Sequence, residues 1–401
     1  NTRVIAIGTR AGYNSTADSN VYIGYSAGRE NRAGIAQVYI GSQAGYYATG
    51  SYNTFVGQDA GLGGTTSAPY SSGGDNVAVG AEALKGFTTA DENTALGYNS
   101  SLNITAGSDN TSVGATSLYR NQIGEDNVAV GYRAGYNVSA SFNTFVGSNA
   151  GFGLNTSPYS SGQNNVAVGY NALDAFTTAN DVVAIGSSAG TAITTGGYHV
   201  LIGSGAGQSL TGGNYTTHVG YRAGRYNTGA SNTSLGYGAL LGASGTSTGG
   251  SNVAIGYNAL TSLTTGNENV VIGKDAGDAI TTAVANIAIG SLAAGALTTG
   301  GDNIAIGYAA LQAADGAEDN NVAIGSGAGQ SINNDASDDN VFIGTYAGKG
   351  GTGELDRCVA IGYQAMDGTG TIAGQQNIFI GDNAGGGSWT TAASNSNVAI
   401  G

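Results

Sequence analysis

The chain has 401 residues, of which 72 are glycine, only 2 are proline and 9% are charged. Ordinary soluble domains are about 25% charged and contain about 7% glycine, so this composition differs from that of an ordinary globular domain. The 40% of hydrophobic residues argues against disorder, and glycine without a Gly-X-Y period argues against collagen. The net charge of −14 excludes the basic surface of a nucleic-acid-binding protein, and no apolar run is long enough to span a membrane.

A motif of the form N-V-A-I-G-Y-x-A-G recurs 23 times along the whole chain. Its glycine stands at positions 8, 24, 41, 57, 80, 97, 114, 131, 147, 169, 186, 203, 220, 236, 256, 273, 290, 307, 325, 344, 362, 381 and 401. The commonest spacing is 17 residues and the longest is 23, which places insertions in one loop of the unit. Both ends of the chain are repeat sequence, so we expect an excerpt of a longer chain or a filament subunit.

Each unit contains one short predicted strand, immediately before the motif glycine. The residue before the glycine is Ile, Val or Leu in all 23 copies, and the residue three before it is Val, Ile or Thr. Such residues favour strands, and alternation puts both on one face, which we expect to be the core. Ile289, Ile306 and Ile324 should therefore form a buried ladder. The Ala or Ser three residues after the glycine should also lie inside the coil.

Asparagine occupies the position four before the glycine in 17 copies, as at Asn252 and Asn321, which predicts a hydrogen-bonded ladder between coils. The single cysteine, Cys358, takes this position in one copy, and we expect it to be a small buried residue rather than a reactive one. Units of about 17 residues are too short for helical-pair repeats. The predicted fold is an all-β parallel β-solenoid (β-roll) of about 23 coils with a 17-residue basic repeat, forming a single continuous domain over residues 1–401.

The residue two before the glycine is Ala in twelve copies and is nowhere charged. By alternation it should point away from the core, so its apolar row would be exposed unless another copy covers it. We therefore expect a parallel homo-oligomer, most simply a trimer; the alternative places this row inside a flattened coil. The candidate subunit interface consists of the six aromatic members: Tyr22, Tyr39, Phe55, Phe145, Phe342 and Phe379.

Tyrosine follows the motif glycine in nine coils, which predicts either cross-strand stacking or a glycan-contact surface. The candidate row is represented by Tyr132, Tyr170, Tyr221, Tyr237 and Tyr257. Asn-x-Ser/Thr sequences also occur, some of them expected by chance in such a composition. The candidate glycosylation sites are Asn14, Asn99, Asn103, Asn110, Asn137, Asn155, Asn214 and Asn232.

The catalytic and metal-binding signatures that we sought are absent from the sequence. The two histidines, His199 and His218, lie in or beside strand positions and are expected to be structural. The G-x-S-x-G strings have no strand-to-helix elbow. Acidic clusters at 315–319 and 335–339 could offer oxygen ligands to Ca²⁺, but without a known spacing we expect solvated turns. The chain is predicted not to be an enzyme and to need no cofactor and no metal.

The copies SNVAIGYNA (Ser251 to Ala259) and DNIAIGYAA (Asp302 to Ala310) resemble the repeats of YadA-like trimeric autotransporter adhesin heads. The resemblance covers essentially the whole chain, although the unit here is longer and Asn stands where the family has Ser. It implies a left-handed β-roll, a homotrimer at the cell surface or outside the cell, and attachment to a surface glycan or matrix receptor. Similar repeats in phage tail-fibre-like proteins imply a virion fibre shaft as an alternative. An ice-binding solenoid is a further alternative, because Thr-Thr pairs recur at residues 88–89, 177–178, 264–265 and 298–299.

Overall fold

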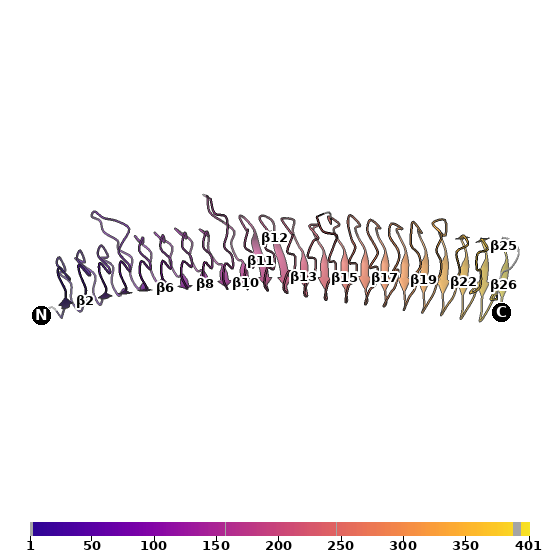
Figure 1. The fold of residues 1–401 in the computed structure, drawn as a ribbon, viewed down its shortest axis with the longest axis horizontal. Helices are drawn as coiled ribbons and strands as arrows, with labels where there is room; N and C mark the ends of the chain where they lie inside the picture. The colour runs from indigo at the N-terminus through magenta and orange to yellow at the C-terminus, as the bar shows by residue number, and fades with distance from the viewer. Residues whose placement is uncertain (1–2, 157, 246, 388–393) are drawn as a thin grey trace. The chain divides into compact units, whose positions relative to one another are not determined.

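The computed structural model describes residues 3–156, 158–245, 247–387 and 394–401, and these contain strands and turns but no helix. The chain divides into two compact units, Asn1–His199 and Val200–Gly401. Each unit is a parallel β-solenoid, so the predicted fold class and the repeat spacing of about 17 residues are confirmed (Figure 1). The single continuous domain over 1–401 and the left-handed winding stay predictions.

In residues 1–199 the repeat strands lie immediately before successive motif glycines, as predicted. They are β1 (Ile5–Ile7), β2 (Val21–Ile23), β3 (Val38–Ile40), β4 (Thr54–Val56), β5 (Val77–Val79), β6 (Thr94–Leu96), β7 (Thr111–Val113), β8 (Val128–Val130), β9 (Thr144–Val146), β10 (Val166–Val168) and β11 (Asn180–Ile185). Strand β12 (Gly197–Ile202) contains the boundary between the units.

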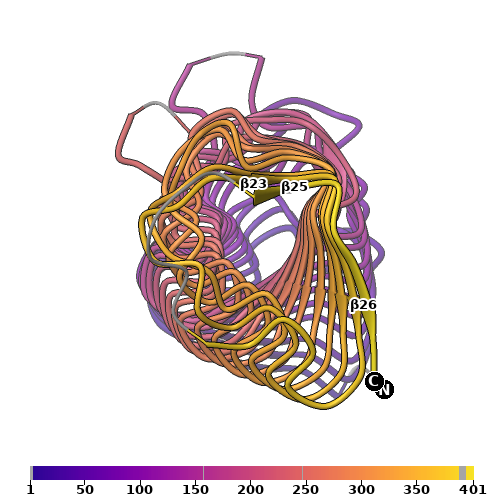
Figure 2. The ribbon, with the colours of Figure 1, turned by 90° about the vertical axis from the view of Figure 1, so that its right-hand side faces the viewer.

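In residues 200–401 the same pattern continues, and three two-residue strands form a second, small parallel sheet. The repeat strands are β13 (Thr217–Val219), β14 (Thr233–Leu235), β15 (Val253–Ile255), β16 (Val270–Ile272), β17 (Ile287–Ile289), β18 (Ile304–Ile306), β19 (Val322–Ile324), β20 (Val341–Ile343), β22 (Val359–Ile361), β24 (Ile378–Ile380) and β26 (Val398–Ile400); the small sheet contains β21 (Leu355–Asp356), β23 (Gly374–Gln375) and β25 (Ser394–Asn395). Figure 2 looks down the stack of coils and shows β26 on one side of the coil and the small-sheet strands β23 and β25 on another.

Equivalent residues of successive coils pair in register. Ala288 of β17 lies opposite Ala305 of β18, and Ala305 lies opposite Ala323 of β19. The motif glycine ends each strand: Gly290 has a φ of +134°, and a Cβ there would lie 2.4 Å from the Gly307 carbonyl oxygen of the next coil. Both the backbone angle and the close approach of the next coil require glycine.

The predicted inner and outer faces of the strands are the wrong way round. The middle residue of each three-residue strand from β2 to β10 and β13 to β20 is buried, while the flanking Val, Ile, Leu or Thr residues are half-buried or exposed. Ile289, Ile306 and Ile324 do form a ladder in register, but it lies on the outside, where Ile324 is 37% exposed. The alternative of an inward middle row is therefore the correct one.

The interior is narrow, because it is filled mainly by alanine from two positions. The middle strand residue meets the Ala or Ser three residues after the motif glycine; Ala27 and Ala44 are fully buried, as are Ser100 and Ser117. This second position was predicted correctly. The row predicted as a subunit interface is instead part of this core. Tyr22, Tyr39, Phe55, Phe145 and Phe342 are fully buried within the chain, and Phe379 is 6% exposed.

Space for each of these six rings comes from a glycine six residues later. A Cβ on Gly61 would lie 2.3 Å from the Phe55 ring, and one on Gly28 would lie 2.2 Å from the Tyr22 ring. The coil after that of Phe55 has the opposite combination: the small Ala78 takes the ring position and the large Leu84 takes the glycine position, and both are fully buried. Large and small residues thus alternate between the two positions so that the interior keeps its volume.

The predicted asparagine ladder is present. Asn286 is typical: its Nδ2 donates to Asn269 Oδ1 at 3.1 Å and to the Gly300 carbonyl at 2.9 Å. Its Oδ1 accepts from the backbone N–H of Asn303 at 3.0 Å. Because these amides are buried and bonded to both neighbouring coils, they satisfy turn backbone groups that water cannot reach. Because these amides are buried, they do not form a ligand-binding row on the surface.

Two longer loops, residues 62–75 and 152–164, rise from the coils of residues 1–199; residue 157 lies outside the described residues (Figure 1). Residues 66–69 at the tip of the first loop are exposed. Each loop returns to the solenoid through a parallel bridge, Ala48 with Ser71 and Val138 with Ser160. The insertions therefore extend the surface without interrupting the core.

Candidate functional site

The outer strand face is the surface formed by the residues one and three positions before each motif glycine. In residues 200–401 every one of these positions is Val, Ile, Leu or Thr, and none is charged. Leu235 is 50% exposed, and Ile202, Ile324, Ile343 and Ile378 are each 36–37% exposed. A contiguous apolar strip of this kind is uncommon on a monomeric protein, which makes this face a candidate binding surface.

The same face recurs in residues 1–199, where Val77, Leu96 and Val128 are 36%, 39% and 38% exposed. An exposed apolar strip was predicted and is present, but it is formed by the residues on either side of the predicted middle row. The middle row is the one that shares the coil interior with the residues after the motif glycine, whereas the paired β-branched residues pack against each other on the outside.

The predicted tyrosine row is exposed in both units. Tyr221, Tyr237 and Tyr257 form a stack with ring centroids 5.2 Å apart and interplanar angles of 23° and 11°. Tyr132 and Tyr170 are 48% and 56% exposed, and the guanidinium of Arg133 lies 4.9 Å from the Tyr132 ring centre. The predicted stacking is thus confirmed for three members, and their solvent-facing rings stay available to a ligand.

A second aromatic stack, which the sequence analysis missed, lies in residues 1–199. Tyr119, Tyr136 and Phe152 stack with centroids 4.9 and 5.3 Å apart. Arg120 lies over Tyr136 at 5.6 Å and over Tyr159 of the second long loop at 5.0 Å. The signal was the placement of these aromatics two residues after the inner Ala or Ser in three successive coils. Cation–π contacts of this type are worth about 0.5–1 kcal/mol at exposed sites.

The candidate glycosylation sites differ in accessibility. Asn99, Asn110, Asn137 and Asn232 are buried, Asn14 and Asn103 are half-buried, and Asn155 and Asn214 are exposed. Asn110 and Asn232 belong to the asparagine ladder, and a glycan on any of the four buried residues would not fit the folded coil. These four candidates are therefore wrong. The sequon of Asn155 ends at residue 157, outside the described residues.

Both histidines and the cysteine are buried, as expected of structural residues. His199 and His218 are fully buried, and His218 Nδ1 lies 2.7 Å from Ser234 Oγ. Cys358 Sγ lies 3.3 Å from the Gly374 carbonyl, in the place that an asparagine amide takes elsewhere. Burial raises the pKa of the Cys358 thiol, which keeps it protonated and poorly nucleophilic at neutral pH.

The first threonine of the pairs in residues 200–401 does not present a free hydroxyl group. Thr264, Thr281 and Thr298 each donate through Oγ1 to a carbonyl of the following coil, at 2.9, 3.1 and 2.8 Å. Their hydroxyls are occupied in connecting coils, so this row does not favour the ice-binding alternative.

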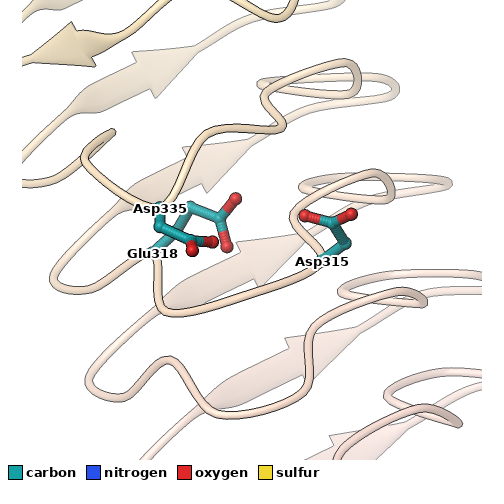
Figure 3. Close-up of side chains that lie close together, drawn as sticks. All are labelled: Asp315, Glu318 and Asp335. Carbon is teal, nitrogen blue, oxygen red and sulfur yellow. The ribbon is translucent and has the colours of Figure 1, made fainter.

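The two acidic clusters, expected to be solvated turns, meet in space. Asp315, Glu318 and Asp335 each place one carboxylate oxygen within 4.8 Å of the others (Figure 3). Glu318 is only 1% exposed. Burial raises its pKa, a hydrogen bond from the Gly316 backbone opposes this, and the charges of Asp315 and Asp335 raise it further.

The fold defines the chain as a β-solenoid repeat protein. It matches no protein-family model, and none of the curated proteins compared with it gives a significant match. The described residues contain no helix suited to crossing a membrane. Function must therefore be argued from the surfaces above.

Proposed function

We propose that the chain is a non-enzymatic structural and adhesive subunit of an extracellular or cell-surface fibre, and that copies associate side by side through the outer strand face. The observation that carries the proposal is the uncharged strip of Val, Ile, Leu and Thr along this face in each unit. Covering such a strip removes apolar surface from water, which stabilises an assembly by about 25 cal/mol per Å².

A second copy of the same chain is the occupant that fits best. The strip repeats with the coil, so a parallel copy related by a rotation axis presents the same side chains at the same heights. A partner of different fold would need an apolar surface that matches the same coil-by-coil repeat. A homotrimer is the form that the resemblance to YadA-like adhesin heads implies, and a phage tail-fibre shaft is the alternative setting with the same physical basis.

Charge placed on the outer strand face should separate the subunits. The variant Ile306→Asp/Ile324→Asp would bury two unpaired carboxylates per subunit in an assembly, at a cost of several kcal/mol each, whereas a lone chain could solvate them. We expect sedimentation velocity to show the parent as an oligomer and the variant as a monomer with an unchanged strand-rich circular dichroism spectrum. Tyr308→Asp/Tyr363→Asp adds the same charge at exposed positions after the motif glycine and should stay oligomeric. An Ile variant that sediments like the parent would show that this face is not the interface.

Glycan binding is a second candidate function, favoured by the exposed stack of Tyr221, Tyr237 and Tyr257. Flat aromatic rings at a regular spacing suit the apolar faces of sugar rings. We expect Tyr237→Ala to abolish binding to immobilised oligosaccharides that the parent retains. Tyr308→Ala is the matched control, because Tyr308 is 59% exposed in the same repeat position but has serines in the neighbouring coils. Equal binding by the two variants would exclude the stack as the contact site.

A further inference from the structure

The acidic cluster joins two consecutive coils of residues 200–401. Asp315 and Glu318 lie in the turn between β18 and β19, and Asp335 lies in the turn between β19 and β20. The motif glycines around these turns are at 307, 325 and 344, spacings of 18 and 19 rather than the commonest 17. The acidic residues therefore occur where the turns are lengthened, and Figure 3 shows Glu318 and Asp335 side by side with Asp315 across from them.

The surroundings of the Glu318 carboxylate are those of a cation ligand. Its side chain is 1% exposed, and Oε2 accepts a hydrogen bond from the Gly316 backbone N–H at 3.0 Å. The other oxygen, Oε1, is buried and has no hydrogen-bond donor among the described residues. A buried carboxylate oxygen without a donor, beside two further carboxylates, is costly unless a cation compensates it.

The surroundings of the three carboxylates supply a further side-chain oxygen and one side that is open to water. The Asn333 amide lies against Asp315; in the amide orientation that satisfies hydrogen bonding, Nδ2 donates to Oδ1 at 2.6 Å and to Oδ2 at 3.2 Å. A half-turn of this amide would present its oxygen instead. Asp335 packs directly onto Gly316, where a Cβ would lie 1.8 Å from Asp335 Oδ1. Asp315 and Asp335 are exposed, which leaves one side open to water ligands.

We propose that Asp315, Glu318 and Asp335, with the Asn333 side-chain oxygen, bind a calcium ion that ties these two coils together. Calcium takes six to eight oxygen ligands at about 2.3–2.6 Å in flexible geometry, so opposite ligands are about 4.6–5.2 Å apart. The carboxylate oxygens, all within 4.8 Å of one another, match that span. Magnesium needs shorter, octahedral contacts, and zinc prefers nitrogen and sulfur ligands.

Isothermal titration of residues 1–401 with CaCl₂ tests the proposal. We expect one saturable site, weakened more than about tenfold in Glu318→Gln, because the variant keeps the shape of the side chain but loses its charge. Glu268→Gln is the control, since it removes the same charge from an exposed turn elsewhere in the same unit, and it should bind like the parent. Absence of saturable binding at millimolar CaCl₂, or equal binding by Glu318→Gln and the parent, would overturn the proposal.

Asp335→Asn provides a second, exposed variant whose folding is not in question. Calcium should raise the thermal midpoint of the parent and of Glu268→Gln, but not of Asp335→Asn or Glu318→Gln. Hydrogen exchange should show calcium-dependent protection in residues 315–319 and 333–339. Equal stabilisation of all four proteins by Ca²⁺, or protection spread evenly over the chain, would identify general charge screening and contradict the site.

Discussion

Replacing Ala305 with aspartate is expected to unfold the coils around it. Ala305 is 1% exposed and lies in register between Ala288 and Ala323, which are fully buried. The substitution puts an unpaired carboxylate into a space filled by methyl groups, so both overpacking and burial of charge act against folding. We expect a loss of about 4 kcal/mol or more in the free energy of unfolding, measured by urea denaturation followed by circular dichroism.

Ile306→Asp is the matched control for this prediction. It introduces the same group one residue further along, on a side chain that faces outward and is half-buried. This variant should keep the strand-rich spectrum even where it weakens subunit association. If Ile306→Asp unfolded the chain while Ala305→Asp left it intact, the inner and outer faces described above would be reversed.

Gly61→Leu is expected to destabilise the fold by more than about 3 kcal/mol, because the new side chain must enter the space of the Phe55 ring. A Cβ at residue 61 already lies 2.3 Å from two atoms of that ring. The backbone angle is not the main obstacle: Gly61 has a φ of +53°, and Leu84 takes the equivalent position of the next coil with a φ of +51°. The melting temperature measured by calorimetry would report the effect.

The double variant Phe55→Ala/Gly61→Leu should recover most of that loss. It converts this coil to the combination that Ala78 and Leu84 form in the next one, with the ring removed where the leucine enters. A double-mutant cycle should therefore give a coupling of at least about 2 kcal/mol between residues 55 and 61. Additive effects of the two substitutions would show that they do not share one volume.

The strand, turn and ladder positions could be predicted from the sequence because each recurs in most or all of the 23 copies and has a local physical cause. The glycine after every strand and the buried asparagines, such as Asn286, required only backbone sterics and hydrogen-bond accounting. The inner alanine position was predicted from the size of its residues alone. Repetition made each of these signals stronger than it would be in a single strand.

The inward face was predicted wrongly because hydrophobicity is a poor guide when both faces of a strand are apolar. The β-branched rows predict a core because they recur in every coil, yet the buried row is the middle one, which holds Ala in twelve coils and a larger residue where a glycine makes room for it. A better signal was present: each of the six aromatics, among them Phe145 and Phe342, is followed six residues later by glycine. When a large residue at one position always occurs with a small residue at another, the two side chains share one space in the core.

The candidate surfaces could be predicted only in part. The tyrosine row follows from its fixed place after the motif glycine, whereas the acidic cluster depends on two lengthened turns meeting across coils. Asp335 reaches Glu318 because it lies 17 residues later, close to one coil. Which side chain in such a cluster is buried depends on the path of each turn, and no repeat fixes that path.

Self-association through the outer strand face is the central claim, and the molar mass of the chain in solution tests it most directly. Light scattering coupled to size-exclusion chromatography should give a multiple of the 39.4 kDa chain mass, and three times that value for the homotrimer. The mass should stay constant on dilution through the micromolar range, as expected for a large apolar interface. A stable, soluble species of 39.4 kDa at every concentration would contradict the account.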